Sequence, residues 1–130
     1  MILKCDKIDI KKHVWSAFNG NQALDLVKER SVDDMFHVIF MDCNMPFKDG
    51  CTASAEIRDY INGRRSADPA WKQPLIVAVT GHTEEQYIEN TLSCGMNMMI
   101  QKPATYKKIK SVLNEARLFF FDPNYDGDMF

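Results

Sequence analysis

Three polar side chains stand at the ends of three apolar segments of this 130-residue chain, and their chemical types suit the handling of phosphate. Asp42 ends one apolar run, Thr80 ends a second, and Lys102 follows a third. If the three runs are parallel strands, their carboxyl ends meet at one edge of a sheet. A carboxylate, a hydroxyl and an ammonium at such an edge form a site that can accept or bind a phosphoryl group.

The apolar runs alternate with segments of helical periodicity. We predict strands at His13–Phe18, His37–Met41, Leu75–Val79 and Met98–Gln101. We predict helices at Asn21–Arg30, from the cap Thr52 through Ile61, at Glu84–Cys94, and after the cap Thr105. The polar stretch Asn62–Gln73 is expected to be an exposed loop, and Gly95 is expected to end the third helix. Alternation of this kind predicts an α/β fold, a doubly wound parallel sheet with helices on both faces.

Composition excludes several classes of function. Hydrophobic residues make up 45% and charged residues 26%, which is ordinary for a soluble domain with one core. The net charge of −2 gives no electrostatic basis for binding nucleic acid. The apolar runs are too short to span a membrane, and we expect no signal peptide. The cysteines show no metal-binding spacing, so we expect four free thiols in a cytoplasmic protein: Cys5, Cys43, Cys51 and Cys94.

The chain resembles the receiver (response regulator) domain of two-component phosphorelay proteins, in the style of hybrid histidine kinases. The matching motifs, in order, are Met41 to Pro46, Asp49-Gly50, Val79 to His82, Gly95 to Asn97, and Lys102-Pro103. The resemblance implies a flavodoxin-like receiver fold with strand order 2-1-3-4-5. It also implies a receiver domain at residues 1–117 and a C-terminal extension or tail at residues 118–130.

The resemblance assigns a role to each matching residue. Asp42 is the phosphoacceptor, and it shares a magnesium ion with the backbone carbonyl of Asn44. Thr80 and Lys102 bind the phosphoryl group after transfer. Pro103, which often follows a cis bond in the family, aims the lysine.

Met99 occupies the position at which many receivers carry an aromatic residue that moves on phosphorylation. The implied function is acceptance of a phosphoryl group from a histidine kinase or a histidine phosphotransfer domain, by a module that is not an enzyme on free substrates. The alternative is a degenerate pseudo-receiver that binds partners without being phosphorylated. A flavodoxin-like enzyme or nucleotide binder is a weaker alternative, because no glycine-rich phosphate loop is present.

The start of the chain departs from the family pattern. A receiver begins with a strand that ends in two adjacent acids, followed by a helix, and these elements, about 20 residues by average lengths, are missing here. Asp6 and Asp9 precede the second strand and do not replace the pair. Magnesium would therefore have Asp42, one carbonyl and water as ligands, so we expect weakened binding.

The missing strand leaves a gap in the expected sheet, which other segments could fill. Leu118–Asp122 is an apolar run that ends in an acid, and as a strand it would bring Asp122 or Asp126 near Asp42. Alternatively, Phe119 and Phe120 continue the last helix. A third filler is a strand from another chain, which would give a homodimer.

Overall fold

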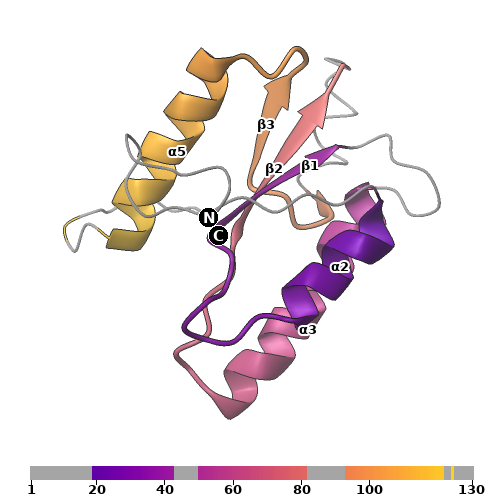
Figure 1. Ribbon diagram of the computed structural model, residues 1–130, viewed down its shortest axis with the longest axis vertical. Coiled ribbons are helices and arrows are strands. Elements are labelled where there is room, and N and C mark those ends of the chain that lie inside the picture. Colours follow the sequence, from indigo (N-terminus) through magenta and orange to yellow (C-terminus); the bar gives the residue numbers. More distant parts are fainter. Residues whose placement is uncertain (1–18, 43–49, 82–92, 122–123, 125–130) are drawn as a thin grey trace.

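The computed structural model describes residues 19–42, 50–81, 93–121 and 124. The described strands form one parallel sheet in the order β1-β2-β3. The strands are β1 (Val38–Asp42), β2 (Leu75–Thr80) and β3 (Met98–Gln101). The helices are α2 (Gly20–Lys28), α3 (Gly50–Ala67) and α5 (Tyr106–Phe121). Figure 1 shows α5 on one side of the sheet and α2 with α3 on the other, as the sequence predicts.

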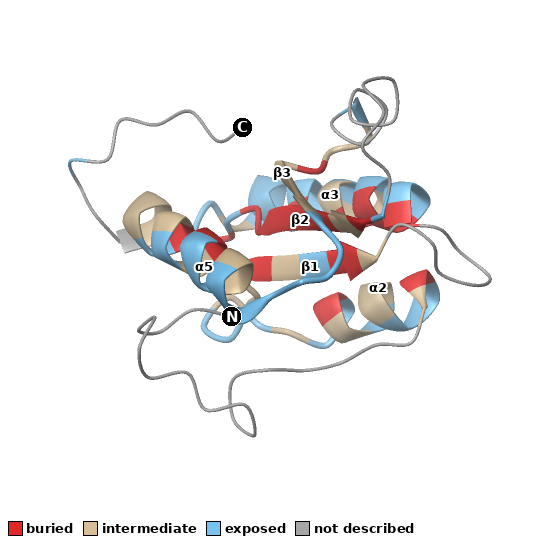
Figure 2. Ribbon diagram, turned by 90° about the horizontal axis from the view of Figure 1, so that it is seen from above, coloured by how far each residue is buried: buried red, intermediate tan, exposed pale blue. Residues whose placement is uncertain are grey.

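Successive residues of β2 point to opposite faces of the sheet, and each face has its own apolar core. Ile76 and Ala78 lie in a cluster with Ile57 and Ile61 of α3. Met41 of β1 belongs to the same cluster, and all five side chains are at most 2% exposed. This continuous apolar pattern is typical of a strand with both faces covered, and Figure 2 shows β2 as largely buried.

The second core joins the sheet to α5. Leu75 and Val77 pack with Val112 and Ala116, which lie four residues apart on one face of that helix. Thr105 caps the helix, since its Oγ1 accepts a hydrogen bond from the Lys108 N–H at 3.4 Å.

The helix α3 is longer than the sequence predicts. It begins at Gly50, so Thr52 lies inside the helix and its predicted role as the cap is wrong. It continues to Ala67, so the expected loop is wrong for residues 62–67. We expected a loop because of Gly63, which lies within the helix with open space around it. In the same turns the Ser66 Oγ donates a hydrogen bond to the Asn62 carbonyl at 3.1 Å. The helix ends before Pro69, which disfavours helical geometry in the residue preceding it.

The last helix settles the alternatives for the C-terminal apolar run. Leu118 to Phe121 belong to α5, so the alternative in which they form a strand is wrong, and continuation of the helix is confirmed. The predicted strand His13–Phe18, most of the predicted helix Glu84–Cys94, and both Asp122 and Asp126 lie outside the described residues. Gly95 has φ +99° and ends that predicted helix as expected.

The expectation of four free thiols is wrong for two of the cysteines. Cys51 and Cys94 form a disulfide bond, with their Cα atoms 5.4 Å apart. The two cysteines are 43 positions apart, a distance that carries no spacing signal, because the pair is created by the packing of α3 against the turn before β3. Cys5 and Cys43 lie outside the described residues. No described helix has the length and apolar character needed to cross a membrane.

Candidate functional site

The register of the sheet brings the predicted site residues to one edge. Asp42 is paired with Val79, so Thr80 lies one residue beyond it on the next strand. Thr80 is in turn paired with Gln101, which places Lys102 one residue further on. The three strands therefore end almost level, as the sequence predicts.

Asp42 and Lys102 form an ion pair across this edge. The Lys102 Nζ lies 3.1 Å from the Asp42 Oδ2, and the side chains are 43% and 44% exposed, respectively. Because both groups meet solvent, the attraction between them is modest and the pair can open at little cost. The Asp42 carboxylate is therefore accessible from solvent.

The backbone around Lys102 is fixed from several directions. Its N–H donates to the Thr80 carbonyl at 2.7 Å, which extends the ladder between β2 and β3 by one residue. The Lys102–Pro103 peptide bond is cis, as the resemblance implies. The Lys108 ammonium donates to the carbonyls of Gln101 at 2.9 Å and Pro103 at 3.3 Å. These contacts hold the turn from which the Lys102 side chain reaches Asp42.

Lys108 was not singled out in the sequence. Its only sequence signal is its position in the first turn of α5, where a basic residue is unfavourable for the helix dipole. The two carbonyls that it contacts offset that cost.

The remaining predicted residues are distributed as follows. Thr80 is fully buried at the end of β2. Met99, the predicted switch position, lies half-buried in β3 and packs against the core cluster on the α3 side of the sheet. Asn44 lies outside the described residues.

The described residues offer few ligands for a metal ion. No group of three or more His, Cys, Asp or Glu side chains capable of holding a metal occurs among them. Asp42 supplies one carboxylate at the edge of the sheet, and Mg²⁺ in phosphate-handling sites is commonly held by one or two carboxylates together with phosphate oxygens and water. The donor set therefore fits magnesium at the lower limit of what such sites contain.

At the opposite end of the sheet, where β2 and β3 begin, several segments are held together by Arg58 of α3. The sequence did not predict this role for Arg58. Its Nε donates to the Gly95 carbonyl at 2.8 Å, and its Nη1 donates to Gln73 Oε1 at 3.1 Å and to the Pro74 carbonyl at 2.6 Å. Its Nη2 donates to Asn97 Oδ1. Burial lowers the pKa of Arg58 to about 10, which still leaves the guanidinium charged at neutral pH.

Asn97 joins this arrangement to the sheet, since its Oδ1 also accepts the Ile76 N–H at 2.9 Å. The arginine therefore ties α3 to the segments that lead into β2 and β3. The sequence contains one signal for this role. Arg58 directly follows Ile57, on a partly buried side of the helix.

A cavity of about 530 Å³ opens beside Arg58, between α3 and the end of α5. Its lining is basic and aromatic, with Arg65, Lys72, Phe119 and Phe120. It shares no residue with the Asp42–Lys102 edge, so it adds nothing to the site at the strand ends.

Comparisons with known proteins agree with this geometry. The sequence model described as the response regulator receiver domain matches residues 6–114. The osmosensing histidine protein kinase SLN1 of Saccharomyces cerevisiae is 35% identical over 105 residues, which cover 80% of this chain and 8% of that protein. Hybrid signal transduction histidine kinase A of Dictyostelium discoideum is 32% identical over 106 residues, covering 79% of this chain and 5% of that protein. The chain thus spans less than a tenth of the length of these relatives.

Solved receiver domains share the fold. The receiver domain of the sensor histidine kinase PA1611 from Pseudomonas aeruginosa, with magnesium in its active site cleft, is 30% identical with a TM-score of 0.59, over 76% of this chain and 71% of that chain. The Mg²⁺ complex of the CKI1 receiver domain from Arabidopsis thaliana is 32% identical with a TM-score of 0.58, over 75% and 68%.

The Saccharomyces cerevisiae Ssk1 receiver, solved with the histidine phosphotransfer protein Ypd1, is 26% identical with a TM-score of 0.68, over 80% and 72%. The expected flavodoxin-like fold is thereby confirmed. The family model covers most of the chain and the strand ends carry the motifs of the family, so the chain belongs to the response regulator receiver domain family.

Proposed function

We propose that this chain is a phosphoacceptor module of a histidine-to-aspartate phosphorelay, and that Asp42 is the residue that becomes phosphorylated. The observation that carries the proposal is the exposed Asp42–Lys102 ion pair, 3.1 Å long, at the level ends of three parallel strands. A solvent-facing carboxylate paired with an ammonium is suited to nucleophilic attack on phosphorus. The ammonium can pair with the phosphoryl oxygens once the negative charge lies on them.

The transfer forms one bond and breaks another. A carboxylate oxygen of Asp42 attacks the phosphorus of a phosphohistidine, the P–N bond breaks, and the electron pair returns to the imidazole. The product on this chain is an acyl phosphate. Lys102 then pairs with a phosphoryl oxygen rather than with the carboxylate.

Thr80 completes the phosphate site in this proposal, with its hydroxyl donating to another phosphoryl oxygen. The side chain is fully buried in the present structure, so contact with the phosphoryl group requires the edge of the sheet to open locally around it. Met99, on the neighbouring strand and half-buried, is the side chain that we expect to repack when this happens.

Asp42 and the backbone carbonyl of Asn44 are the groups that would hold magnesium. The ion, when bound, would neutralise negative charge on the phosphoryl oxygens during transfer. With one carboxylate in the set we expect weak binding and a requirement for high magnesium concentrations.

The partner is a histidine kinase or a histidine phosphotransfer protein. Support comes from the related receiver domains, which belong to histidine kinases or, in the case of Ssk1, are bound to a phosphotransfer protein. The module acts on its own carboxylate and not on free substrates. We also propose a receiver domain at residues 1–117 and a C-terminal extension at residues 118–130. The helix α5 crosses this boundary, since it continues to Phe121.

Phosphorylation of the full chain by a small acyl phosphate donor with Mg²⁺, followed by intact mass measurement, tests the proposal. We expect a gain of one phosphoryl group that is lost in Asp42→Asn and retained in Asp59→Asn, a matched change at an exposed position of α3. No gain in a chain whose circular dichroism shows it to be folded would instead favour the pseudo-receiver.

A further inference from the structure

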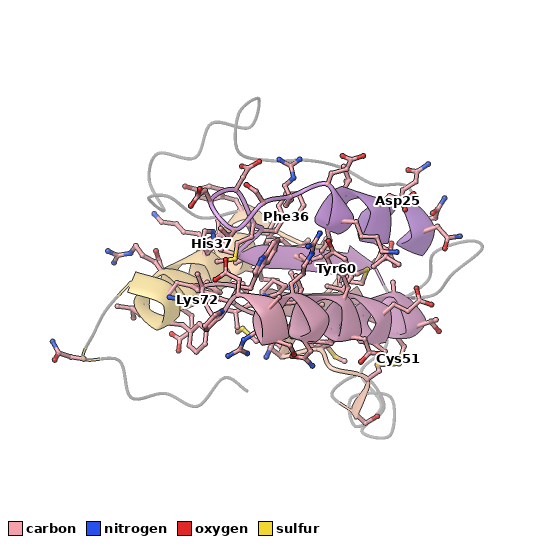
Figure 3. All side chains as sticks on the ribbon, turned by 90° about the horizontal axis from the view of Figure 1, so that it is seen from below. Asp25, Phe36, His37, Cys51, Tyr60 and Lys72 are labelled. Carbon is pink, nitrogen blue, oxygen red and sulfur yellow. A yellow bond between two sulfur atoms is a disulfide. The ribbon has the colours of Figure 1, made fainter. Side chains whose placement is uncertain are left out.

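The disulfide between Cys51 and Cys94 lies outside the phosphoacceptor site and joins the start of α3 to the turn before β3. Cys51, which is labelled in Figure 3, is the second residue of α3 and lies at one end of that helix. Cys94 directly precedes Gly95, in the turn that leads into β3. The bond closes a covalent loop that contains α3, β2 and Thr80.

A second, non-covalent contact holds the same turn against the same helix. Arg58 follows Cys51 by seven residues, about two helical turns, so the two side chains lie on one face of α3. Its Nε donates to the Gly95 carbonyl at 2.8 Å. A Cβ atom on Gly95 would lie 3.1 Å from the Arg58 Cγ, which means that the turn packs directly on the arginine side chain.

This arrangement keeps the two sulfur atoms near each other whether or not they are bonded. Arg58 also contacts Pro74 and Asn97, which anchor it to the segments leading into the sheet. Breaking the disulfide therefore leaves Cys94 attached to α3 through its neighbour Gly95. Re-formation of the bond is then an intramolecular event at a high effective concentration of thiol.

The fold does not depend on the sulfur atoms for its core. Cys51 is exposed and Cys94 is half-buried, and neither belongs to the apolar clusters on the two faces of the sheet. Reduction therefore opens no cavity. Both redox states can share one fold.

Cys51 is also the more reactive of the two positions by its surroundings. Its side chain is exposed on the first turn of an 18-residue helix. The positive end of a helix stabilises a thiolate, and the thiolate is the form that takes part in exchange with disulfides.

We propose that Cys51 and Cys94 are a reversible thiol–disulfide modification site, whose redox partner is a small thiol–disulfide couple of the glutathione class. The Cys51 thiolate attacks glutathione disulfide, the S–S bond of the oxidant breaks, and one glutathione thiolate leaves. The Cys94 thiolate then attacks the Cys51 sulfur of the mixed disulfide and releases the second glutathione.

Two electrons pass from the protein thiols to glutathione disulfide, and the two protons that the cysteines lose are taken up by the released glutathione thiolates or by water. Reduction by glutathione is the reverse sequence. This proposal does not depend on phosphorylation of Asp42.

The test is a redox titration of the full chain in glutathione buffers, from fully reduced to fully oxidised, with quenching by an alkylating reagent. Intact mass and peptide mapping report which cysteines are bonded. We expect one reversible transition between the dithiol and the 51–94 disulfide, with unchanged circular dichroism. Cys51→Ser and Cys94→Ser should each abolish it.

Three results would overturn the proposal: a pair that never oxidises, a pair that never reduces in these buffers, or bonds that join Cys51 or Cys94 to other cysteines instead. Loss of the folded circular dichroism spectrum on reduction would do the same, because it would make the bond a fixed structural element.

The role of the arginine has a separate test. Arg58→Lys keeps the charge but loses the planar fork that reaches several carbonyls, so it should loosen the turn that carries Cys94. Oxidation of the Arg58→Lys variant should need a ratio of glutathione disulfide to glutathione about tenfold higher than that of the wild-type chain. Arg65→Ala, on the same helix, should leave the transition unchanged. An unchanged transition in folded Arg58→Lys would remove Arg58 from the proposal.

Discussion

The two edges of the parallel sheet each carry a basic side chain, and the two are held in opposite ways. At the carboxyl edge, Lys102 faces Asp42 at 3.1 Å, with both side chains more than two-fifths exposed. At the amino edge, Arg58 donates to four acceptors, and burial lowers its pKa to about 10. The Lys102 ammonium can exchange its partner at little cost, whereas the Arg58 guanidinium is held in the folded structure by all four contacts.

With Lys102 in its proposed role, the two ends of one sheet divide function from stability. A charge that is exposed and lightly bonded contributes little to folding and can be used for chemistry. A charge that is desolvated and surrounded by acceptors is expensive to remove, because its partners are left unsatisfied. We therefore expect substitution of Arg58 to lower the stability of the fold. Substitution of Lys102 should instead lower the rate of phosphorylation and leave stability almost unchanged.

The largest effect on folding is expected from Arg58→Ala. The substitution leaves the acceptors on Gly95, Gln73 and Asn97 without their donor, so the free energy of unfolding should fall by about 3 kcal/mol. Urea denaturation followed by circular dichroism measures it. Arg65→Ala is the matched control and should change stability by less than ~0.5 kcal/mol. Equal effects of the two variants would show that Arg58 stabilises the fold no more than an exposed arginine of the same helix does.

Lys102→Ala should behave in the reverse way. Loss of an exposed ion pair should change the free energy of unfolding by less than about 1 kcal/mol. The rate of phosphorylation by a small donor should fall by a factor of about ten or more. The reason is the loss of a fixed cation beside the negative charge that develops on the phosphoryl oxygens. Lys107→Ala, at an exposed position of α5, serves as the control. A large loss of stability without loss of phosphorylation would contradict this assignment.

The smallest effect is on the pH dependence of stability, and it concerns His37, which directly precedes β1. Burial, together with the nearby Lys72 ammonium, lowers the pKa of His37 below its ordinary value of 6.5. Below pH 6.5 the unfolded chain then binds this proton more readily than the folded chain. Stability should therefore rise with pH through this window and be lost as pH falls toward the folded-state pKa.

The urea midpoint of the wild-type chain should fall between pH 7 and pH 5 by more than that of His37→Gln. Carboxylates titrate in both proteins, so only the difference between them reports on the histidine. Parallel pH profiles would show that His37 is not the responsible group. His37 contacts Phe120 edge-on with ring centroids 4.9 Å apart, so the overall stability of the two proteins must be compared at pH 7 first.

The sequence predicted the parts of the molecule that depend on local pattern. The three apolar runs became β1, β2 and β3 with ends displaced by at most one residue, and their terminal residues predicted the Asp42–Lys102 edge. Thr105 and Gly95 marked helix ends correctly, because capping and positive φ depend on residue type.

What the sequence could not reveal depends on packing between distant segments. The Arg58 contacts join residues 15 to 39 positions apart, and the disulfide joins residues 43 apart. Neither leaves a periodic signal. The last turns of α3 were missed for another reason, since Gly63 is a weak helix former and yet lies inside the helix.

The most direct test of Asp42 as the phosphoacceptor is to locate the phosphoryl group on the wild-type chain. Borohydride reduces an acyl phosphate and converts the modified aspartate to homoserine, which peptide mass spectrometry can place. We expect homoserine at position 42 and at no other aspartate, and only after treatment with the phosphodonor. Reduction at a different aspartate, or a phosphorylated chain with no homoserine at position 42, would contradict it.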